Sequence, residues 1–236
     1  MAHPSAAIII IGNEVLSGRT QDKHVSFFAS ELEKLGIPVV EVRIIRDQVD
    51  LIAKHVNELR FQATYVFTTG GIGPTHDDVT AEGIACAFSV EVEENPEALN
   101  ILLEYYGDQI NEGRRRMARM PKGARLISNP LSSAPGFFVE NVYTFAGIPS
   151  VAQAMFFSIA AQLQKGEEIF SSSHVFEIPE SLVAMKLAHI QSQYDDVEIG
   201  SYPYFKQGKV GTTIIGRSKN SGSLNRAMED IRGITF

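Results

Sequence analysis

The residues best suited to chemistry in this chain are a group of glycines followed by two adjacent carboxylates. They lie in the segment Thr68-Thr-Gly-Gly-Ile-Gly-Pro-Thr-His-Asp-Asp-Val-Thr80. The glycines let a ligand approach bare backbone N–H groups, which attract anions. Asp77 and Asp78 would repel an anion unless a divalent cation bridged them to it, and carboxylate oxygens are ligands that Mg²⁺ prefers. The segment therefore predicts a metal-bridged phosphate site. Its glycines are Gly70, Gly71 and Gly73.

Part of this segment also has a purely structural interpretation. Thr75 with Asp78 three residues later is the pattern of a capping box, in which two side chains satisfy backbone N–H groups at the start of a helix. A cap does not explain three glycines beside two neighbouring carboxylates. We therefore favour the ligand site, with Asp78 and Asp77 as catalytic and metal-binding residues.

A second loop, Gly12 to Thr20, is expected at the same edge of the sheet, because it also follows a predicted strand. Its one carboxylate is Glu14. Glu14 is either an exposed loop acid, as most lone glutamates are, or a group that completes a metal site or activates a water. Both interpretations stay open. Glu14 is the third catalytic candidate, and Ser17 of the same loop is a ligand-binding candidate.

The most basic stretch of the chain is Arg114-Arg-Arg-Met-Ala-Arg119. We expect a helix over Asn111–Met120, on which Arg115 and Arg119 share a face and can converge on phosphate oxygens. A solvated helix face is the usual explanation of such a run. In an acidic chain with a predicted phosphate site, we favour ligand contact by Arg115 and Arg119.

The elements that must position these residues alternate between strand and helix. This alternation is typical of an α/β fold with a mostly parallel sheet and helices on both faces, in which ligands gather at the carboxyl ends of the strands. The link between Gly136–Glu140 and Val142–Ala146 is too short for a crossover, so these strands should form an antiparallel hairpin. Other strands are predicted at Ala6–Ile11, Val39–Ile45 and Thr64–Thr68, and helices at Asp22–Leu35, Val49–Leu59, Asp77–Phe88, Pro96–Tyr106 and Ser150–Gln164.

A polar, serine-rich stretch, Lys165–Ser173, predicts a boundary between two domains. Residues 1–168 would form the ligand-binding domain, and residues 169–236 a small α+β domain of order βαββα. A segment of that size folds alone only marginally, and it carries no convergent polar motif. We therefore expect it to serve association, which favours a homodimer or a higher homo-oligomer.

The composition excludes several classes of partner. With 21 basic and 28 acidic residues the formal net charge is -7, which disfavours nucleic acid. The single cysteine, Cys86, rules out an intrachain disulfide and a cysteine-rich metal site, and it fits a reducing cytoplasm. The apolar run Ala6–Ile11 is too short for a membrane span, so no membrane association is expected.

Four motifs together carry a family resemblance: Ile11-Gly-Asn-Glu-Val-Leu-Ser-Gly18, Thr69-Gly-Gly-Ile-Gly-Pro-Thr-His-Asp-Asp-Val-Thr80, Ala134-Pro-Gly-Phe137 and Ala146-Gly-Ile-Pro-Ser150. With them the chain resembles the molybdopterin-binding (molybdenum cofactor biosynthesis) domain family, and within it the competence/damage-inducible protein A branch. The resemblance covers roughly residues 5–165. The remainder is similar to the small βαββα domain of that branch, and the amidase domain that ends many such proteins is not expected.

This resemblance implies a function as well as a fold. Relatives bind molybdopterin in the phosphate loop. Members of this branch, like the related domain of eukaryotic FAD synthases, are nucleotide pyrophosphatases that act on ADP-ribose or FAD-type substrates with a divalent metal such as Mg²⁺ or Co²⁺. Two positions depart from relatives, since His24 replaces a frequent asparagine and Val151 a frequent glutamate. By resemblance, ligand or metal contacts fall to Gly70, Gly71, Gly73, Thr75, Asp77 and Asp78, and the opposite wall to Gly136, Gly147, Pro149 and Ser150.

We therefore expect a metal-dependent nucleotide pyrophosphatase for an ADP-ribose- or FAD-like dinucleotide. Two alternatives stay open. One is a molybdopterin-binding protein of molybdenum cofactor biosynthesis without hydrolase activity, and the other is a non-catalytic nucleotide-binding module. In each case the partner is a small phosphorylated ligand, either a dinucleotide or molybdopterin.

Overall fold

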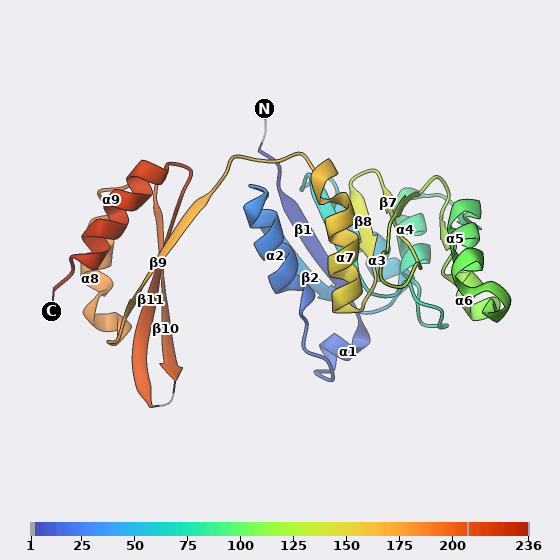
Figure 1. Ribbon diagram of the computed structural model, residues 1–236, viewed down its shortest axis with the longest axis horizontal. Coiled ribbons are helices and arrows are strands. Elements are labelled where there is room, and N and C mark those ends of the chain that lie inside the picture. The colour runs from blue at the N-terminus through green and yellow to red at the C-terminus, as the bar shows by residue number, and fades with distance from the viewer. Residues whose placement is uncertain (1–2, 207, 236) are drawn as a thin grey trace. The chain divides into compact units, whose positions relative to one another are not determined.

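The N-terminal part of the chain is built on a six-stranded sheet of order β2-β1-β3-β8-β7-β6 (Figure 1). The first four of these strands run parallel, and β7 and β6 are added antiparallel. The expected hairpin is therefore confirmed, with β7 paired to β8. The strands are β1 (Ala6–Ile11), β2 (Val39–Ile45), β3 (Tyr65–Thr69), β6 (Arg125–Ile127), β7 (Gly136–Val139) and β8 (Val142–Phe145).

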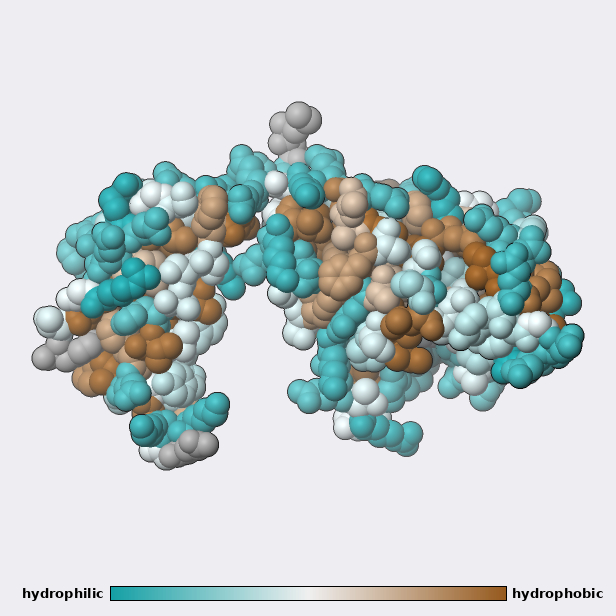
Figure 2. Space-filling view, viewed as in Figure 1, coloured by the Kyte–Doolittle hydropathy of each residue, from teal (hydrophilic) through white to brown (hydrophobic). Residues whose placement is uncertain are grey.

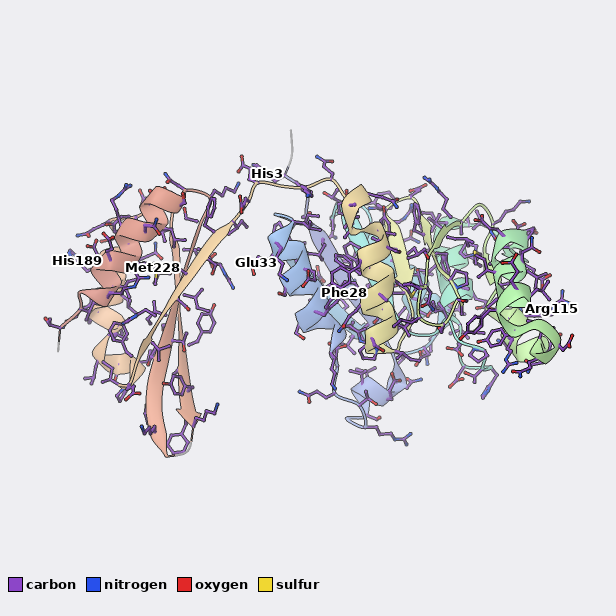
Figure 3. The ribbon with its side chains drawn as sticks, viewed as in Figure 1. His3, Phe28, Glu33, Arg115, His189 and Met228 are labelled. Atoms are coloured by element: carbon purple, nitrogen blue, oxygen red, sulfur yellow. The ribbon has the colours of Figure 1, made fainter. Side chains whose placement is uncertain are left out.

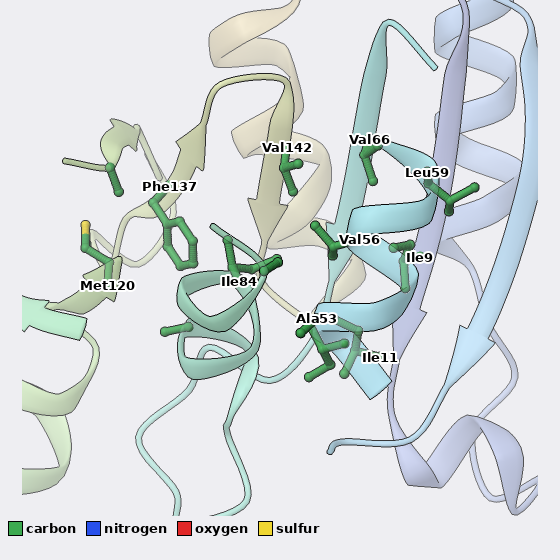
Figure 4. Packing of buried hydrophobic residues seen from close by; sticks show 14 of the residues in the cluster. Ile9, Ile11, Ala53, Val56, Leu59, Val66, Ile84, Met120, Phe137 and Val142 are labelled. Atoms are coloured by element: carbon green, nitrogen blue, oxygen red, sulfur yellow. The ribbon is translucent and has the colours of Figure 1, made fainter. Parts of the chain in front are cut away.

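Helices cover both faces of this sheet, as predicted for an α/β fold. On one face, α3 (Val49–Leu59) and α4 (Thr80–Phe88) bury alternate residues of β1 such as Ile9 (Figure 4). On the other face, α2 (His24–Lys34) and α7 (Pro149–Ile159) bury Ile8 and its neighbours around Phe28 (Figure 3). Because every residue of β1 is buried, its sequence is a continuous apolar run rather than an alternating one.

The structure is a computed structural model, and it describes residues 3–206 and 208–235. These divide into an N-terminal unit, Met1–Gly166, and a C-terminal unit, Glu167–Phe236. In the described part of the chain, no helix is long and apolar enough to cross a membrane.

Between α4 and β6 the chain departs from the expected pattern. The predicted helix Asn111–Met120 is wrong beyond Arg116, because α6 spans only Glu112–Arg116 and β5 (Arg119–Pro121) follows it. β5 pairs antiparallel with β4 (Val92–Glu94), a partner distant in sequence that helical periodicity does not reveal. The predicted helix start at Asp77 is also wrong, because α4 begins at Thr80. The remaining elements of the N-terminal unit are α1 (Asn13–Leu16), α5 (Pro96–Tyr106) and the short 3₁₀ helices η1 (Gly107–Gln109) and η2 (Ala160–Gln162).

The C-terminal unit has the predicted βαββα order. Its three strands form an antiparallel sheet of order β10-β11-β9, and its helices enclose a separate small core around Ile214 and Met228. The division between the two units, after Gly166, lies within the polar stretch Lys165–Ser173. The last four residues of that stretch belong to β9, whose alternate side chains are exposed along an edge of this sheet. The elements are β9 (Phe170–Phe176), η3 (Glu180–Leu182), α8 (Ala184–Gln191), β10 (Glu198–Lys206), β11 (Lys209–Ser218) and α9 (Ser221–Arg232).

Candidate functional site

The glycine loop begins directly after β3 and turns back toward α4. Gly70 has φ +96° and Gly71 φ +67°, a backbone region that L side chains rarely adopt. A Cβ at Gly70 would also lie 2.1 Å from the carbonyl oxygen of Ile11. Glycine is therefore required here by conformation and by the close approach of the end of β1.

Thr80, the first residue of α4, closes the loop. Its buried hydroxyl donates to the carbonyl oxygen of Gly70 at 2.8 Å, and its backbone N–H donates to the carbonyl oxygen of Gly71 at 2.9 Å. Both glycine carbonyls are thereby turned into the protein. The sequence prediction had not singled out Thr80.

Thr75 and Asp78 interact, but not as a helix cap. Asp78 Oδ2 accepts from the Thr75 backbone N–H at 2.8 Å and from the Thr75 hydroxyl at 2.5 Å. The N-cap of α4 is Val79, four residues after Thr75, so the capping-box interpretation of Thr75 is wrong. The pair instead ties together the exposed turn that follows the glycines.

The neighbouring carboxylate, Asp77, is also held in its charged form. The nearby Thr75 hydroxyl and the backbone N–H of Asp77 lower the pKa of this exposed carboxyl below its usual value. The Thr75 hydroxyl has a single proton, which it donates to Asp78 Oδ2 at 2.5 Å. The backbone N–H of Asp77 is therefore the main cause of the lowered pKa of Asp77. With its lowered pKa, Asp77 is negative at neutral pH.

These residues line a cleft of about 540 Å³ at the carboxyl ends of the parallel strands. The cleft brings together loops that follow β1, β2, β3 and β8. Four carboxylates border it, and the Asp77–Asp78 pair faces a first loop that contributes Glu14. The polar and glycine residues of its lining are Asn13, Glu14, Arg19, Asp47, Gly70, Gly71, Gly73, Thr75, Asp77, Asp78, Asn129, Ser132 and Gly147.

Asp47 is a cleft residue that sequence reasoning missed. It follows β2, and its Oδ2 accepts from the backbone N–H of Asn13 at 2.8 Å. This bond fixes the start of the loop that carries Glu14, whose carboxylate folds back over Gly12. The position after a parallel strand was a sufficient signal, because carboxyl ends of such strands share one edge.

A second missed residue, Asn129, shapes the opposite wall. Its side-chain amide donates to the Ser132 hydroxyl at 2.7 Å and to the Ala134 carbonyl at 2.8 Å, while its oxygen accepts from the backbone N–H groups of Leu131 and Ser132. Asn129 is 6% exposed. Its side chain therefore holds the 129–134 loop in one conformation against the cleft.

The arginines are divided between two environments. Arg115 forms a bidentate pair with Glu94 on β4, with Nη2 2.9 Å from Oε1 and Nε 3.1 Å from Oε2, and it lies at the outer end of α6 (Figure 3). Arg116 and Arg119 instead border a small hollow beside Gly71. Because Arg119 is on β5, the expected shared helix face of Arg115 and Arg119 does not exist.

Of the remaining predicted site residues, one lines the cleft and the others lie outside its lining. Gly147 lines the cleft, and a Cβ there would lie 3.2 Å from the Cα of Gly70. Gly136 is packed in β7, where a Cβ would meet Thr144 and Met155. Pro149 and Ser150 open α7, and their neighbours Ile148 and Val151 provide the lining. The Ser17 hydroxyl donates to the carbonyl oxygen of Glu14 and is not among the lining residues.

No group of three His, Cys, Asp or Glu side chains in the described residues is close enough to hold a metal ion by itself. A cation between Asp77 and Asp78 would therefore need ligand oxygens or water to complete its shell, which is how Mg²⁺ is usually held against phosphate. His24 is buried at the start of α2, with Nδ1 3.0 Å from Asp22 Oδ1, and it lies outside the cleft lining.

Comparisons with known proteins agree with this architecture. The chain is 36% identical over 214 residues to a protein of Archaeoglobus fulgidus, covering 90% of each chain. It is 28% identical to a probable FAD synthase of Caenorhabditis elegans, covering 97% of this chain and 49% of that protein, so it spans about half of that relative. The crystal structure of the protein CinA from Thermoplasma acidophilum is 29% identical with a TM-score of 0.63, covering 67% of this chain and 98% of that one.

Two family models divide the chain much as the structure does. The model described as FAD synthase, middle domain, matches residues 168–234, which make up most of the C-terminal unit. The model described as probable molybdopterin binding domain matches residues 7–165, which carry the whole cleft. The chain therefore belongs to the molybdopterin-binding domain family, as its motifs predicted.

Proposed function

We propose that this protein is a metal-dependent nucleotide pyrophosphatase that acts on an ADP-ribose- or FAD-like dinucleotide. The observation that carries the proposal is the meeting of a glycine loop with Glu14, Asp47, Asp77 and Asp78 across one cleft. Backbone amides alone suit an anion, whereas four carboxylates suit a cation, and a pyrophosphate with a divalent metal satisfies both. The similarity to a probable FAD synthase supports the choice of substrate class.

The chain's own residues have distinct tasks in the proposed reaction. The backbone amides of the glycine loop and Arg116, which borders the hollow beside Gly71, hold phosphate oxygens. Asp47 positions the loop that carries Glu14. Glu14 accepts a proton from water as the water oxygen bonds to one phosphorus. The bridging P–O bond breaks, its electrons stay on the leaving phosphate, and two monophosphates result. Asp77 and Asp78 would hold a divalent metal, which would stabilise the negative charge of the phosphate oxygens.

Molybdopterin binding without hydrolysis is the second candidate function. The description of the matching family model favours it, and so does Val151 at a cleft position where related chains often carry glutamate. A non-catalytic nucleotide-binding module would use the same cleft. For all three functions we propose a cytoplasmic location, since a single cysteine fits a reducing compartment. We also propose self-association, since a unit as small as the C-terminal one folds alone only marginally.

One experiment separates these functions. ADP-ribose, FAD and molybdopterin are incubated separately with the protein, with Mg²⁺, with Co²⁺ or with EDTA, and AMP release and ligand binding are both measured. The proposal predicts AMP from ADP-ribose or FAD that EDTA abolishes. Stoichiometric molybdopterin binding with no AMP under any metal would replace it by the second candidate. Nucleotide binding without cleavage would leave the non-catalytic module.

A further inference from the structure

The outer edge of β2 is the long open edge of the main sheet. β2 is the last strand on its side, and within the described residues no strand pairs with its outer side. It has seven residues, whereas β6 at the opposite end has three. An edge strand presents a row of unpaired N–H and C=O groups that can pair with another chain. Length makes β2 the stronger candidate for such pairing.

One face of β2 carries an exposed apolar stripe. Val40 is 59%, Val42 40% and Ile44 42% exposed, and all three are β-branched residues suited to a sheet. Edge strands of monomers are commonly protected by proline and by charged residues, lysine above all. β2 contains no proline or lysine, and its two charged residues, Glu41 and Arg43, alternate with this stripe and so lie on the other face. The edge strand β10 of the C-terminal unit, in contrast, contains Pro203 and Lys206. On the face shown in Figure 2, apolar residues gather in patches among polar ones.

The other face of β2 carries one negative and one positive side chain, Glu41 and Arg43, which restrict the strands that can pair with it. Arg43 Nε donates to Glu41 Oε1 at 2.7 Å, and Arg43 also contacts Glu58 and His55 on α3. The Glu41 side chain is 41% exposed and keeps acceptor capacity for a second arginine. A strand that pairs here must therefore avoid placing a like charge directly opposite Glu41 or Arg43.

The sequence of β2 meets this demand itself. In an antiparallel pair of two copies centred on Val42, Glu41 lies opposite Arg43 of the second copy, and Val40 lies opposite Ile44. Centring the pair on Glu41 would oppose two glutamates, and centring it on Arg43 would oppose two arginines. Like charges directly opposite each other destabilise a sheet. The register about Val42 is thus the one of these three that the charges allow.

We propose that β2 is a self-association surface, on which two copies of this chain pair antiparallel about Val42 and join their sheets. The partner is a second copy because its edge is complementary to itself in charge and in apolar side chains, as a two-fold symmetric interface requires. A single strand pair buries less surface than a standard interface. The dimer is therefore weak, with a dissociation constant on the order of micromolar.

The symmetry gives a sharp test, because residue 42 of one copy faces residue 42 of the other at a Cα separation of about 4.5–5.5 Å. The dimer constants of the full chain, Val42→Lys and Val42→Glu are measured by sedimentation equilibrium. Each variant alone should weaken the dimer at least about tenfold by like-charge repulsion. An equimolar mixture of the two should restore dimers, now as heterodimers. Val90→Lys, at a position 37% exposed in the same unit, is the matched control and should leave the dimer unchanged.

Three results would overturn the proposal. The wild-type chain could be monomeric up to several hundred micromolar, roughly the weakest range a specific interface would occupy. Val42→Lys could dimerise as the wild type does. The two charged variants, each folded by circular dichroism, could fail to associate with one another although each had lost its own dimer. The pyrophosphatase assay decides the proposed function separately, because β2 lies outside the cleft lining.

Discussion

The hydroxyl of Thr80 and the carbonyl oxygen of Gly70 lie 2.8 Å apart and join the two ends of the glycine loop inside the protein. Thr80→Val keeps the shape of the side chain and removes this donor. We expect a loss of about 1–3 kcal/mol in unfolding free energy, because the buried Gly70 carbonyl loses its partner. Urea denaturation measures the loss, and weaker ligand binding should accompany it. Thr80→Ser, which keeps the hydroxyl, should restore most of both.

Gly70 and Gly18 both have positive φ, but only Gly70 is crowded. At Gly18 no atom lies within 4 Å of an added Cβ, whereas at Gly70 the Ile11 carbonyl oxygen would be 2.1 Å away. Gly18→Ala should therefore cost about 1 kcal/mol from backbone strain alone. Gly70→Ala should cost about 3 kcal/mol or more, since the clash adds to the strain. Thermal unfolding of the two variants compares them, and equal losses would contradict this geometry.

Asp78 is the residue whose charge and hydrogen bonds can be separated. Asp78→Asn keeps an oxygen that can accept from Thr75 but removes the charge that a cation needs. We expect a stability change within about 1 kcal/mol, with turnover reduced by orders of magnitude and its dependence on metal flattened. Turnover of ADP-ribose over a Mg²⁺ titration measures this.

Thr75→Ala is the control for that substitution, because it removes the hydroxyl bond to Asp78 and leaves both carboxylates charged. It should lower stability slightly and retain metal-dependent turnover. If Asp78→Asn and Thr75→Ala lowered the melting temperature alike and both turned over at the wild-type rate, Asp78 would serve only to tie the turn.

The lowered pKa of Asp77 predicts a particular acid titration. A carboxyl with a depressed folded pKa stabilises the fold above its unfolded pKa, and this contribution is lost as the pH falls through the folded value. NMR of labelled aspartate carboxyls should show the Asp77 midpoint below the ordinary 3.8. Thr75→Ala should leave that midpoint nearly unchanged, because the Thr75 hydroxyl donates its one proton to Asp78. A clear upward movement would show instead that the Thr75 hydroxyl lowers the pKa of Asp77.

Arg115 and Arg116 are adjacent but should respond differently to substitution. Arg116 borders the hollow beside the glycine loop, whereas Arg115 is engaged by Glu94, which raises the pKa of its guanidinium. Arg116→Gln should weaken inorganic pyrophosphate binding about tenfold through loss of one charge-assisted hydrogen bond. Arg115→Gln should leave binding within about twofold. Isothermal titration calorimetry measures both, and the reverse order would return the ligand contact to Arg115.

The sequence by itself determined the parts that depend on local signals. Apolar runs and helical spacing predicted the parallel sheet with helices on both faces and the βαββα order of the C-terminal unit, because burial imposes a periodicity on each element. The glycines after β3 predicted the loop, since only glycine adopts its backbone angles without strain. The motifs also identified the family.

The tertiary structure decided what depends on residues far apart in the sequence. The pairing of β4 with β5 moved Arg119 from a helix to a strand, because a three-residue strand is stabilised by its partner rather than by its own pattern. Asp47 lies in the cleft beside Asn13, 34 residues away in the sequence, and accepts a hydrogen bond from its backbone N–H. The glycine loop is closed by Thr80 rather than by Thr75, because α4 begins at Thr80 and not at Asp77 as the sequence predicted. Long-range pairing, which no local window contains, therefore set the geometry of the site.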